Sequence, residues 1–143
     1  MTSEEYITHS AEETIALGRK LAPTLKSARM VILRGSLGAG KTTLVKGIAE
    51  GLHAASPDDV TSPTFTLIHE YGDGRVYHVD LYRLDEPREV ATLGLEEFFE
   101  RDALVLIEWG ERFPQLLPAE RTEIRIRPLG NEEREIEVTR LPS

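Results

Sequence analysis

The chain has 143 residues, of which 40% are hydrophobic and none is cysteine, and its formal net charge is −8. This length fits one domain, expected to span residues 1–143, with a real hydrophobic core. The acidic balance argues against autonomous binding of RNA or DNA, which requires basic surface. The lack of cysteine excludes disulfides, thiolate metal sites and thiol catalysis. The start at Met1–Glu5 is unlike a secretory signal, and no apolar run is long enough to span a membrane, so we expect a cytoplasmic protein.

The first predicted helix begins at a capping box. Ser10 is the expected N-cap, and Glu13 follows three residues later, at the spacing that lets both side chains satisfy free backbone groups. The apolar residues that follow fall near one helix face: Ile15, Leu17, Leu21 and Leu25. We expect the helix to fade around Pro23. It either packs against the core or places its start beside a bound nucleotide.

A complete phosphate-binding pattern, G-x-x-x-x-G-K-[ST], spans Gly35–Thr42. Its glycines allow backbone torsions that turn successive N–H groups towards phosphate oxygens. Lys41 supplies a positive charge for the terminal phosphates, and the Thr42 hydroxyl is a ligand for Mg²⁺. The apolar run Met30–Leu33 is typical of a strand, and residues 43–50 have helical spacing. Because strand, loop and helix in this order aim the positive end of a helix at an anion, we predict binding of a nucleoside triphosphate.

A segment rich in hydroxyl groups follows at Val60–Thr66, where Pro63 favours an extended backbone. In phosphate-loop enzymes a threonine in this region often senses Mg²⁺ and the terminal phosphate. Thr61 and Thr64 are therefore candidate switch residues. An ordinary loop leading into a strand is an equal alternative.

The next two segments predict a β-hairpin. Thr66–Tyr71 and Arg75–Val79 flank a turn at Gly72-Asp73-Gly74. His69 and His78 fall on these strands, but their spacing from other ligand types suggests no metal site. We interpret both histidines as structural.

Two acidic residues come directly after predicted strands. Asp80 ends the second hairpin strand, and Glu108 follows Ala103–Ile107, an apolar run typical of a central strand. Ligands of α/β sheets bind at the carboxyl ends of the strands. Asp80 is therefore interpreted as a Mg²⁺-binding carboxylate, with a helix cap as the alternative, and Glu108 as a metal ligand or the group that orients the attacking water. Trp109 either packs in the core or covers the pocket.

The remaining segments complete an α/β pattern. A helix is expected from Asp85, with Pro87 in its first turn. Thr122–Arg127 and Arg134–Thr139 alternate polar and apolar residues, which predicts an antiparallel hairpin whose charges form a solvated face. The expected fold is a three-layer α/β domain with a mostly parallel central sheet and this hairpin at its edge.

Four motifs in order extend the interpretation: Gly35–Thr43, Thr61–Leu67, His78–Leu84 and Ile107–Trp109. Together they resemble the TsaE family, also called YjeE, over nearly the whole chain from about Ile7 onwards. These bacterial ATPases work with the TsaD and TsaB proteins to make threonylcarbamoyladenosine at position 37 of tRNAs. The resemblance implies a P-loop NTPase fold and Mg²⁺-dependent ATP hydrolysis. We expect this hydrolysis to be weak without the partners, because no arginine is evidently committed to the charge that develops on the phosphates. The acidic balance of the chain fits contact with tRNA only through those partners.

The resemblance also implies a set of site residues. Those expected to bind ATP are Ala11, Leu37, Gly38, Ala39, Gly40, Lys41, Thr42 and Thr43. Lys41, Asp80 and Glu108 are the implied catalytic residues, and Mg²⁺ is implied at Thr42, Asp80 and Glu108. The segment Thr61–Thr64 corresponds to the switch.

At two positions the chain departs from the family pattern. Ala11 stands where relatives often carry an acid, which leaves only a backbone contact with the nucleotide. Arg88 replaces an acid in the stretch Glu86–Glu89, which weakens any partner contact inferred from that helix.

Two other functions compete with an ATPase that serves a partner complex. A small-molecule kinase of the phosphate-loop type needs an acceptor pocket and usually an arginine-rich lid, and only Arg83 and Arg88 stand out. A nucleotide-gated binding module has no need of a carboxylate such as Glu108. A GTPase is disfavoured because Asn131 is the only asparagine and Glu132 follows it, so the Asn-Lys-x-Asp motif that reads guanine is missing.

Overall fold

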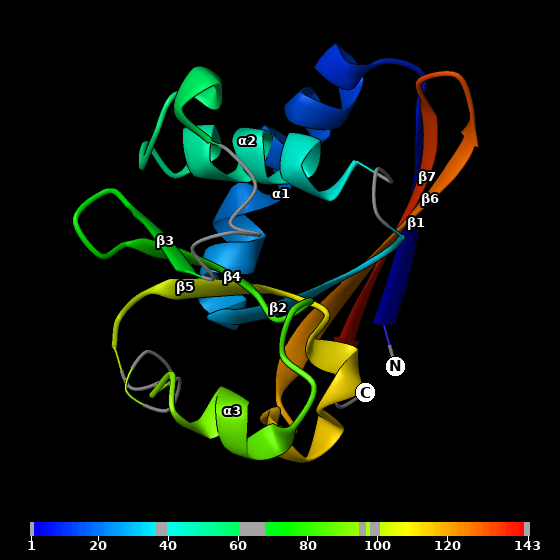
Figure 1. The fold of residues 1–143 in the computed structure, drawn as a ribbon. Coiled ribbons are helices and arrows are strands. Elements are labelled where there is room, and N and C mark those ends of the chain that lie inside the picture. Colours follow the sequence, from blue (N-terminus) through cyan, green and yellow to red (C-terminus); the bar gives the residue numbers. More distant parts are fainter. Residues whose placement is uncertain (1, 37–39, 61–67, 95–96, 98–100, 142–143) are drawn as a thin grey trace.

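The computed structural model describes residues 2–36, 40–60, 68–94, 97 and 101–141. These residues form a seven-stranded sheet in the order β1-β7-β6-β2-β5-β4-β3, with helices on both faces (Figure 1). The strands are β1 (Thr2–Thr8), β2 (Met30–Arg34), β3 (Ile68–Tyr71), β4 (Val76–Asp80), β5 (Leu104–Glu108), β6 (Arg121–Gly130) and β7 (Glu133–Leu141). The α-helices are α1 (Ala11–Ala28), α2 (Lys41–Gly51) and α3 (Pro87–Ala91), and the 3₁₀ turns are η1 (Pro57–Asp59), η2 (Gly110–Arg112) and η3 (Pro114–Leu116).

The middle of the sheet is parallel. β2 pairs in parallel with β5 and with β6, and β4 pairs in parallel with β5. The flanking pairs β1–β7, β7–β6 and β3–β4 are antiparallel, and the last of these is the predicted hairpin. All five residues of β5 are buried, as are the first four of β2, which suits strands that are covered on both faces. The expectation of a mostly parallel sheet therefore describes the centre but not the flanks.

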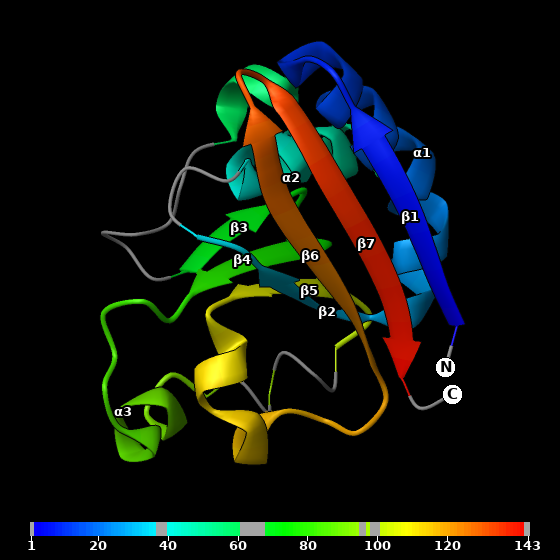
Figure 2. The same ribbon diagram turned by 90° about the vertical axis from the view of Figure 1, so that its right-hand side faces the viewer.

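The predicted place of the C-terminal hairpin at the sheet edge is wrong, because β1 lies outside it. β1 pairs along β7 from Thr2↔Arg140 to Thr8↔Arg134 and takes the edge position (Figure 2). This strand was not predicted because its residues are mainly polar. Its side chains nevertheless alternate, since Tyr6 packs against the core and Thr8 is buried, whereas Ile7 is 56% exposed.

Helix α1 starts as predicted but ends later. Ser10 caps it by accepting a hydrogen bond from the N–H of Glu13. The helix then continues through Pro23 to Ala28, so the prediction that it fades around Pro23 is wrong. A proline inside a helix costs about 3 kcal/mol. Tertiary packing offsets this cost, because Leu25 in the last turn is 1% exposed and belongs to the main core.

Helices α1 and α2 approach each other so closely that two glycines are required. A Cβ on Gly47 would lie 2.0 Å from the carbonyl oxygen of Ile15, and a Cβ on Gly18 would lie 2.6 Å from that of Leu44. Real Cβ atoms do not make such short contacts with backbone. The two glycines therefore bring the helices together and fix where α2 begins relative to α1.

Separate hydrophobic clusters cover the two faces of the sheet. On one face Leu33 and Leu106 pack with residues of α1 and α2. On the other face Ile32 packs with Val90 of α3 and with Phe113, which lies between η2 and η3. Among the described residues, α3 contributes five residues to this second outer layer. None of the helices in the described residues combines the length and apolar character needed to cross a lipid bilayer.

We expect Gly47→Ala to lower the free energy of unfolding by more than about 2 kcal/mol, because overpacking at a backbone contact outweighs the helix propensity of about 1 kcal/mol gained from alanine. Lys46→Ala in the same helix is the matched control, with an expected change below about 1 kcal/mol. Urea unfolding of both variants and the wild type measures the difference. Equal stability of all three proteins would contradict the close approach of the helices.

Candidate nucleotide-binding site

The phosphate-loop pattern lies between a buried strand and a helix. β2 ends at Arg34 and α2 begins at Lys41, so the predicted order of strand, loop and helix is present. Gly40, directly before the helix, has a φ of +109°, a conformation that side chains rarely adopt, which explains the glycine at this place in the pattern. The predicted nucleotide-binding residues 37–39 (Leu37, Gly38 and Ala39) lie outside the described residues.

Lys41 is held in a nearly buried position, with 5% of its surface exposed. Its Nζ donates a hydrogen bond to the carbonyl oxygen of Gly35 at 2.7 Å and lies 3.4 Å from Oε1 of Glu108. The same atom lies 4.3 Å from the centroid of the Trp109 ring. A buried ammonium group needs such partners to offset the loss of its hydration. Together they hold the positive charge of Lys41 against the phosphate loop.

Asp80 and Glu108 are neighbours at the carboxyl edge of the sheet. They are the last residues of β4 and β5 and occupy paired positions in a parallel ladder, so their side chains leave the same face. Asp80 is 2% exposed and Glu108 is 4% exposed, which is rare for carboxylates. Oδ1 of Asp80 accepts a hydrogen bond from the N–H of Tyr82 at 2.8 Å. Asp80 therefore stabilises the turn after β4 rather than capping a helix.

His78 contacts Glu108 directly, a contact that the sequence analysis missed. Its Nε2 lies 2.5 Å from Oε2 of Glu108, and its ring has no exposed surface. Metal-ligand spacing alone indicates a structural role for His78 and does not point to this contact. Strand periodicity is the signal that points to this contact, since His78 precedes Asp80 by two residues in β4 and therefore shares its face.

The surroundings of Glu108 keep its carboxyl group ionised. Burial by itself raises the pKa of Glu108, but the hydrogen bond and charge of His78, and then those of Lys41, outweigh it and hold the pKa below the ordinary value of 4.5. An ionised carboxylate can only accept hydrogen bonds. His78 must therefore donate to it through Nε2–H.

The oxygen atoms at this edge fit Mg²⁺. Asp80 and Glu108 supply carboxylates, and Thr42 supplies a hydroxyl from the first turn of α2. Mg²⁺ prefers oxygen ligands and is usually held by one or two carboxylates together with phosphate oxygens and water. Among the described residues, no group of three or more His, Cys, Asp or Glu could hold a metal ion on its own. The donor set therefore suits a metal ion that binds together with nucleotide phosphates.

A cavity of about 180 Å³ lies beside the start of α2. Three of the predicted nucleotide-binding residues, Ala11, Gly40 and Thr43, line it. Glu132 and Arg134 from the end of the β6–β7 hairpin line it as well. The alternation of polar and apolar residues predicts a solvated face for the charges of this hairpin, but it does not show what the end of a hairpin contacts, so it does not point to these two residues.

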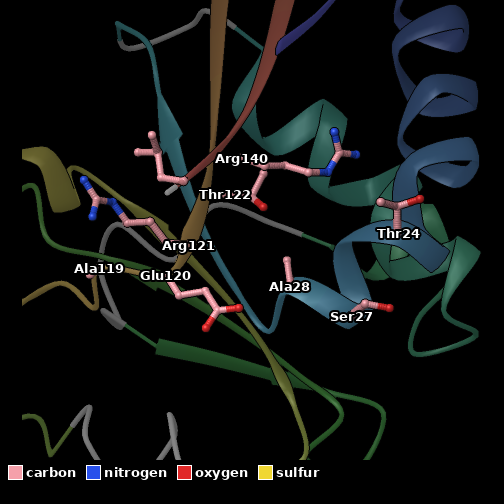
Figure 3. A pocket seen from close by; sticks show the side chains of 9 residues that line it. Thr24, Ser27, Ala28, Ala119, Glu120, Arg121, Thr122 and Arg140 are labelled. Carbon is pink, nitrogen blue, oxygen red and sulfur yellow. The ribbon is translucent and has the colours of Figure 1, made fainter. Parts of the chain in front are cut away.

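A larger cavity of about 620 Å³ contains none of the predicted site residues. It lies between the end of α1, which contributes Ser27, and the first residues of β6 and last residues of β7 (Figure 3). Its arginines have acidic partners, since Arg121 pairs with Glu123 and Arg140 pairs with Glu4. Because α/β sheets bind ligands at the carboxyl ends of their parallel strands, this cavity at the amino end of β6 is not a candidate for the phosphates.

Trp109 lies at the site itself. Its φ of +67° is unusual for a bulky residue, and such backbone strain clusters at functional sites. One face of its ring carries Lys41, and the ring centroid lies 5.1 Å from that of Tyr82. The predicted switch residues Thr61 and Thr64 lie outside the described residues.

The sequence profile of a protein family described as "Threonylcarbamoyl adenosine biosynthesis protein TsaE" matches residues 8–136. The chain belongs to the TsaE family. A relative from Bacillus subtilis (strain 168) is 43% identical over 141 residues, which cover 97% of this chain and 87% of the relative. A relative from Treponema pallidum (strain Nichols) is 38% identical over 133 residues, which cover 92% of this chain and 97% of the relative. Both relatives carry the name "tRNA threonylcarbamoyladenosine biosynthesis protein TsaE".

A solved structure has the same fold. The crystal structure of Bacillus subtilis YdiB matches this chain with a TM-score of 0.74 and 37% sequence identity, over 98% of this chain and 86% of YdiB. The similarity confirms the mixed α/β fold. TsaE family proteins act in the biosynthesis of threonylcarbamoyladenosine in tRNA.

We expect Glu108→Gln to change how stability depends on pH. Because the folded-state pKa of Glu108 is lowered, its carboxylate stabilises the fold above the unfolded pKa of about 4.5, and this contribution is lost as the pH falls through the folded pKa. The difference in unfolding free energy between the wild type and the variant should therefore be largest near neutral pH and shrink below about pH 4.5. Urea unfolding of the nucleotide-free proteins at a series of pH values measures it. A difference that stays constant across the series would contradict the lowered pKa.

Proposed function

We propose that this chain is a Mg²⁺-dependent ATPase that drives the TsaD and TsaB proteins in making threonylcarbamoyladenosine at position 37 of tRNAs. The observation that carries the proposal is that the phosphate-loop lysine, Lys41, lies 3.4 Å from Glu108, a carboxylate at the end of a central strand. Membership of the TsaE family supports the pathway. The net charge of −8 favours contact with tRNA through the partners rather than by this chain alone.

Lys41 changes partners when the nucleotide binds. Its ammonium group contacts the carbonyl oxygen of Gly35 and the carboxylate of Glu108 in the structure. Charge-assisted hydrogen bonds to phosphate are stronger than bonds to a neutral carbonyl. Lys41 therefore binds the terminal phosphates together with the free N–H groups at the start of α2, as in a P-loop NTPase.

Glu108 prepares the attack of water. Its ionised oxygens accept a hydrogen bond from the water and turn its lone pair towards the terminal phosphate. Thr42, Asp80 and Glu108 have the oxygen atoms to hold Mg²⁺, which supplies positive charge against the phosphates. The cavity beside Ala11 and Arg134 receives the part of the nucleotide beyond the phosphates. We place this reaction in the cytoplasm.

We expect Lys41→Ala to weaken ATP binding by a factor of about 10 to 100 or more, because a hydrogen bond to a charged group contributes about 1.5–3 kcal/mol. The variant should keep its fold, since the charge of Lys41 serves the loop rather than the hydrophobic clusters. Calorimetric titration with ATP measures the affinity, and Lys46→Ala in the same helix is the control. A folded Lys41→Ala variant with unchanged affinity would rule out the proposed site.

We expect slow ATP hydrolysis by the chain alone and a large stimulation by TsaD and TsaB. An arginine that stabilises the charge developing on the phosphates contributes roughly 10³–10⁵ in rate and is often supplied in trans. Arg83, beyond Asp80 in the same segment, is the alternative in cis. Steady-state hydrolysis with and without the partners is the measurement. A fast basal rate that the partners leave unchanged would contradict the expectation, and a phosphorylated metabolite in place of free phosphate would indicate a kinase.

A further inference from the structure

We propose that His78 is a positioning residue that holds Glu108 in place for ATP hydrolysis by binding one of its two carboxylate oxygens. The inference rests on the proposed ATPase function and adds a residue to it. Lys41, Asp80 and Glu108 account for phosphate binding, metal binding and water activation. None of these roles explains why a fully buried histidine lies against the catalytic carboxylate.

Strand register places His78 under Glu108. In the parallel ladder of β4 and β5, Asp80 pairs with Glu108, and His78 pairs with Leu106, one step further along the same face. From there Nε2 of His78 reaches Oε2 of Glu108 at 2.5 Å, while Nζ of Lys41 lies 3.4 Å from Oε1. The two oxygens of Glu108 therefore have different partners.

The ring of His78 forms its hydrogen bond with Glu108. Its Nδ1 is buried, and no described residue forms a hydrogen bond with it, which is costly for a polar atom. An apolar side chain would fill the same space without this cost. What the imidazole provides that an apolar side chain lacks is the donor at Nε2. That donor is directed at Glu108.

The hydrogen bond limits how Glu108 can move. A glutamate has three side-chain torsions, and without the Nε2–H donor Glu108 would be free to turn both oxygens towards Lys41. With Oε2 fixed by His78, Oε1 keeps one direction, facing the phosphate loop. Catalytic groups must be held within about 0.5 Å of their productive positions, and loss of a residue that orients a metal ligand costs about 10–100-fold in affinity or activity.

Three variants separate positioning from packing. His78→Leu removes the donor and keeps an apolar side chain, and His78→Gln restores an N–H at similar reach. His69→Leu is the matched control, because His69 pairs with His78 across β3 and β4 and its ring packs edge-on against Tyr71. The full chain of each variant is assayed with TsaD and TsaB for kcat and KM, with calorimetry for the ATP affinity and thermal melts for folding.

We expect His78→Leu to lower kcat about 10–100-fold while ATP affinity changes less than about threefold, and His78→Gln to restore kcat to within about fivefold of the wild type. His69→Leu should behave as the wild type. Normal kcat in His78→Leu, or an equal loss in both His78 variants, would overturn the proposal. If kcat falls together with the ATP affinity or with the melting temperature, His78 has a structural role, and this outcome would also overturn the proposal.

A measurement without turnover keeps this inference separate from the proposed function. In nuclear magnetic resonance spectra of the nucleotide-free chain with ¹⁵N-labelled histidine, we expect a slowly exchanging Nε2–H signal from His78. Glu108→Ala should shift this signal, and Glu123→Ala on β6 should leave it in place. If the wild type hydrolyses ATP but the His78 signal does not shift in Glu108→Ala, only the proposed role of His78 is overturned. A wild type that does not hydrolyse ATP with its partners would overturn the proposed function, and the role of His78 with it.

Discussion

The burial of three polar groups, Lys41, Glu108 and His78, is the constraint on which the rest of the site depends. Their exposed fractions are 5%, 4% and 0%. Removing such groups from water is costly, and apolar residues of similar size would often stabilise a fold as well or better. The arrangement is tolerated because each charge faces a partner of opposite sign or a hydrogen-bonding atom. A buried polar cluster of this kind is therefore better explained by a functional role than by its contribution to stability.

The sheet brings these groups together through strand register. Leu33 of β2 and Asp80 of β4 both pair with Glu108 of β5. These three neighbouring strands are therefore aligned at the same position along the sheet, near their carboxyl ends. The chain leaves β2 after Arg34, at that level, and returns to it at Lys41, the first residue of α2. The contact between the two helices, which only glycine permits, fixes the position of α2 against α1. A shift of one residue in either strand pairing would turn Glu108 or Asp80 to the opposite face.

Sequence patterns predicted the parts of this structure that follow local rules. The strand before the phosphate-loop pattern, the helix after it, the buried run of β5 and the capped start of α1 each show a signal within a few residues. The sequence analysis failed where partners distant in sequence decide the outcome. β1 forms a strand because it pairs with β7. Helix α1 continues past Pro23 because its last turn packs in the core. The end of the β6–β7 hairpin lines a cavity because these two strands extend to the start of α2. The contact of His78 with Glu108 has the same origin, since it needs both the alternation within β4 and the register with β5.

Lys41 and Glu108 restrain each other, and under the proposed function this contact couples phosphate binding to the carboxylate. The positive charge that binds phosphate is the same charge that occupies Oε1 of Glu108. When Lys41 binds phosphate oxygens instead of Glu108, Oε1 of Glu108 becomes available to the metal ion and to water. Oε2 of Glu108 keeps its hydrogen bond to His78. Nucleotide binding and preparation of the catalytic carboxylate are then one event, because a single ammonium group moves between two acceptors.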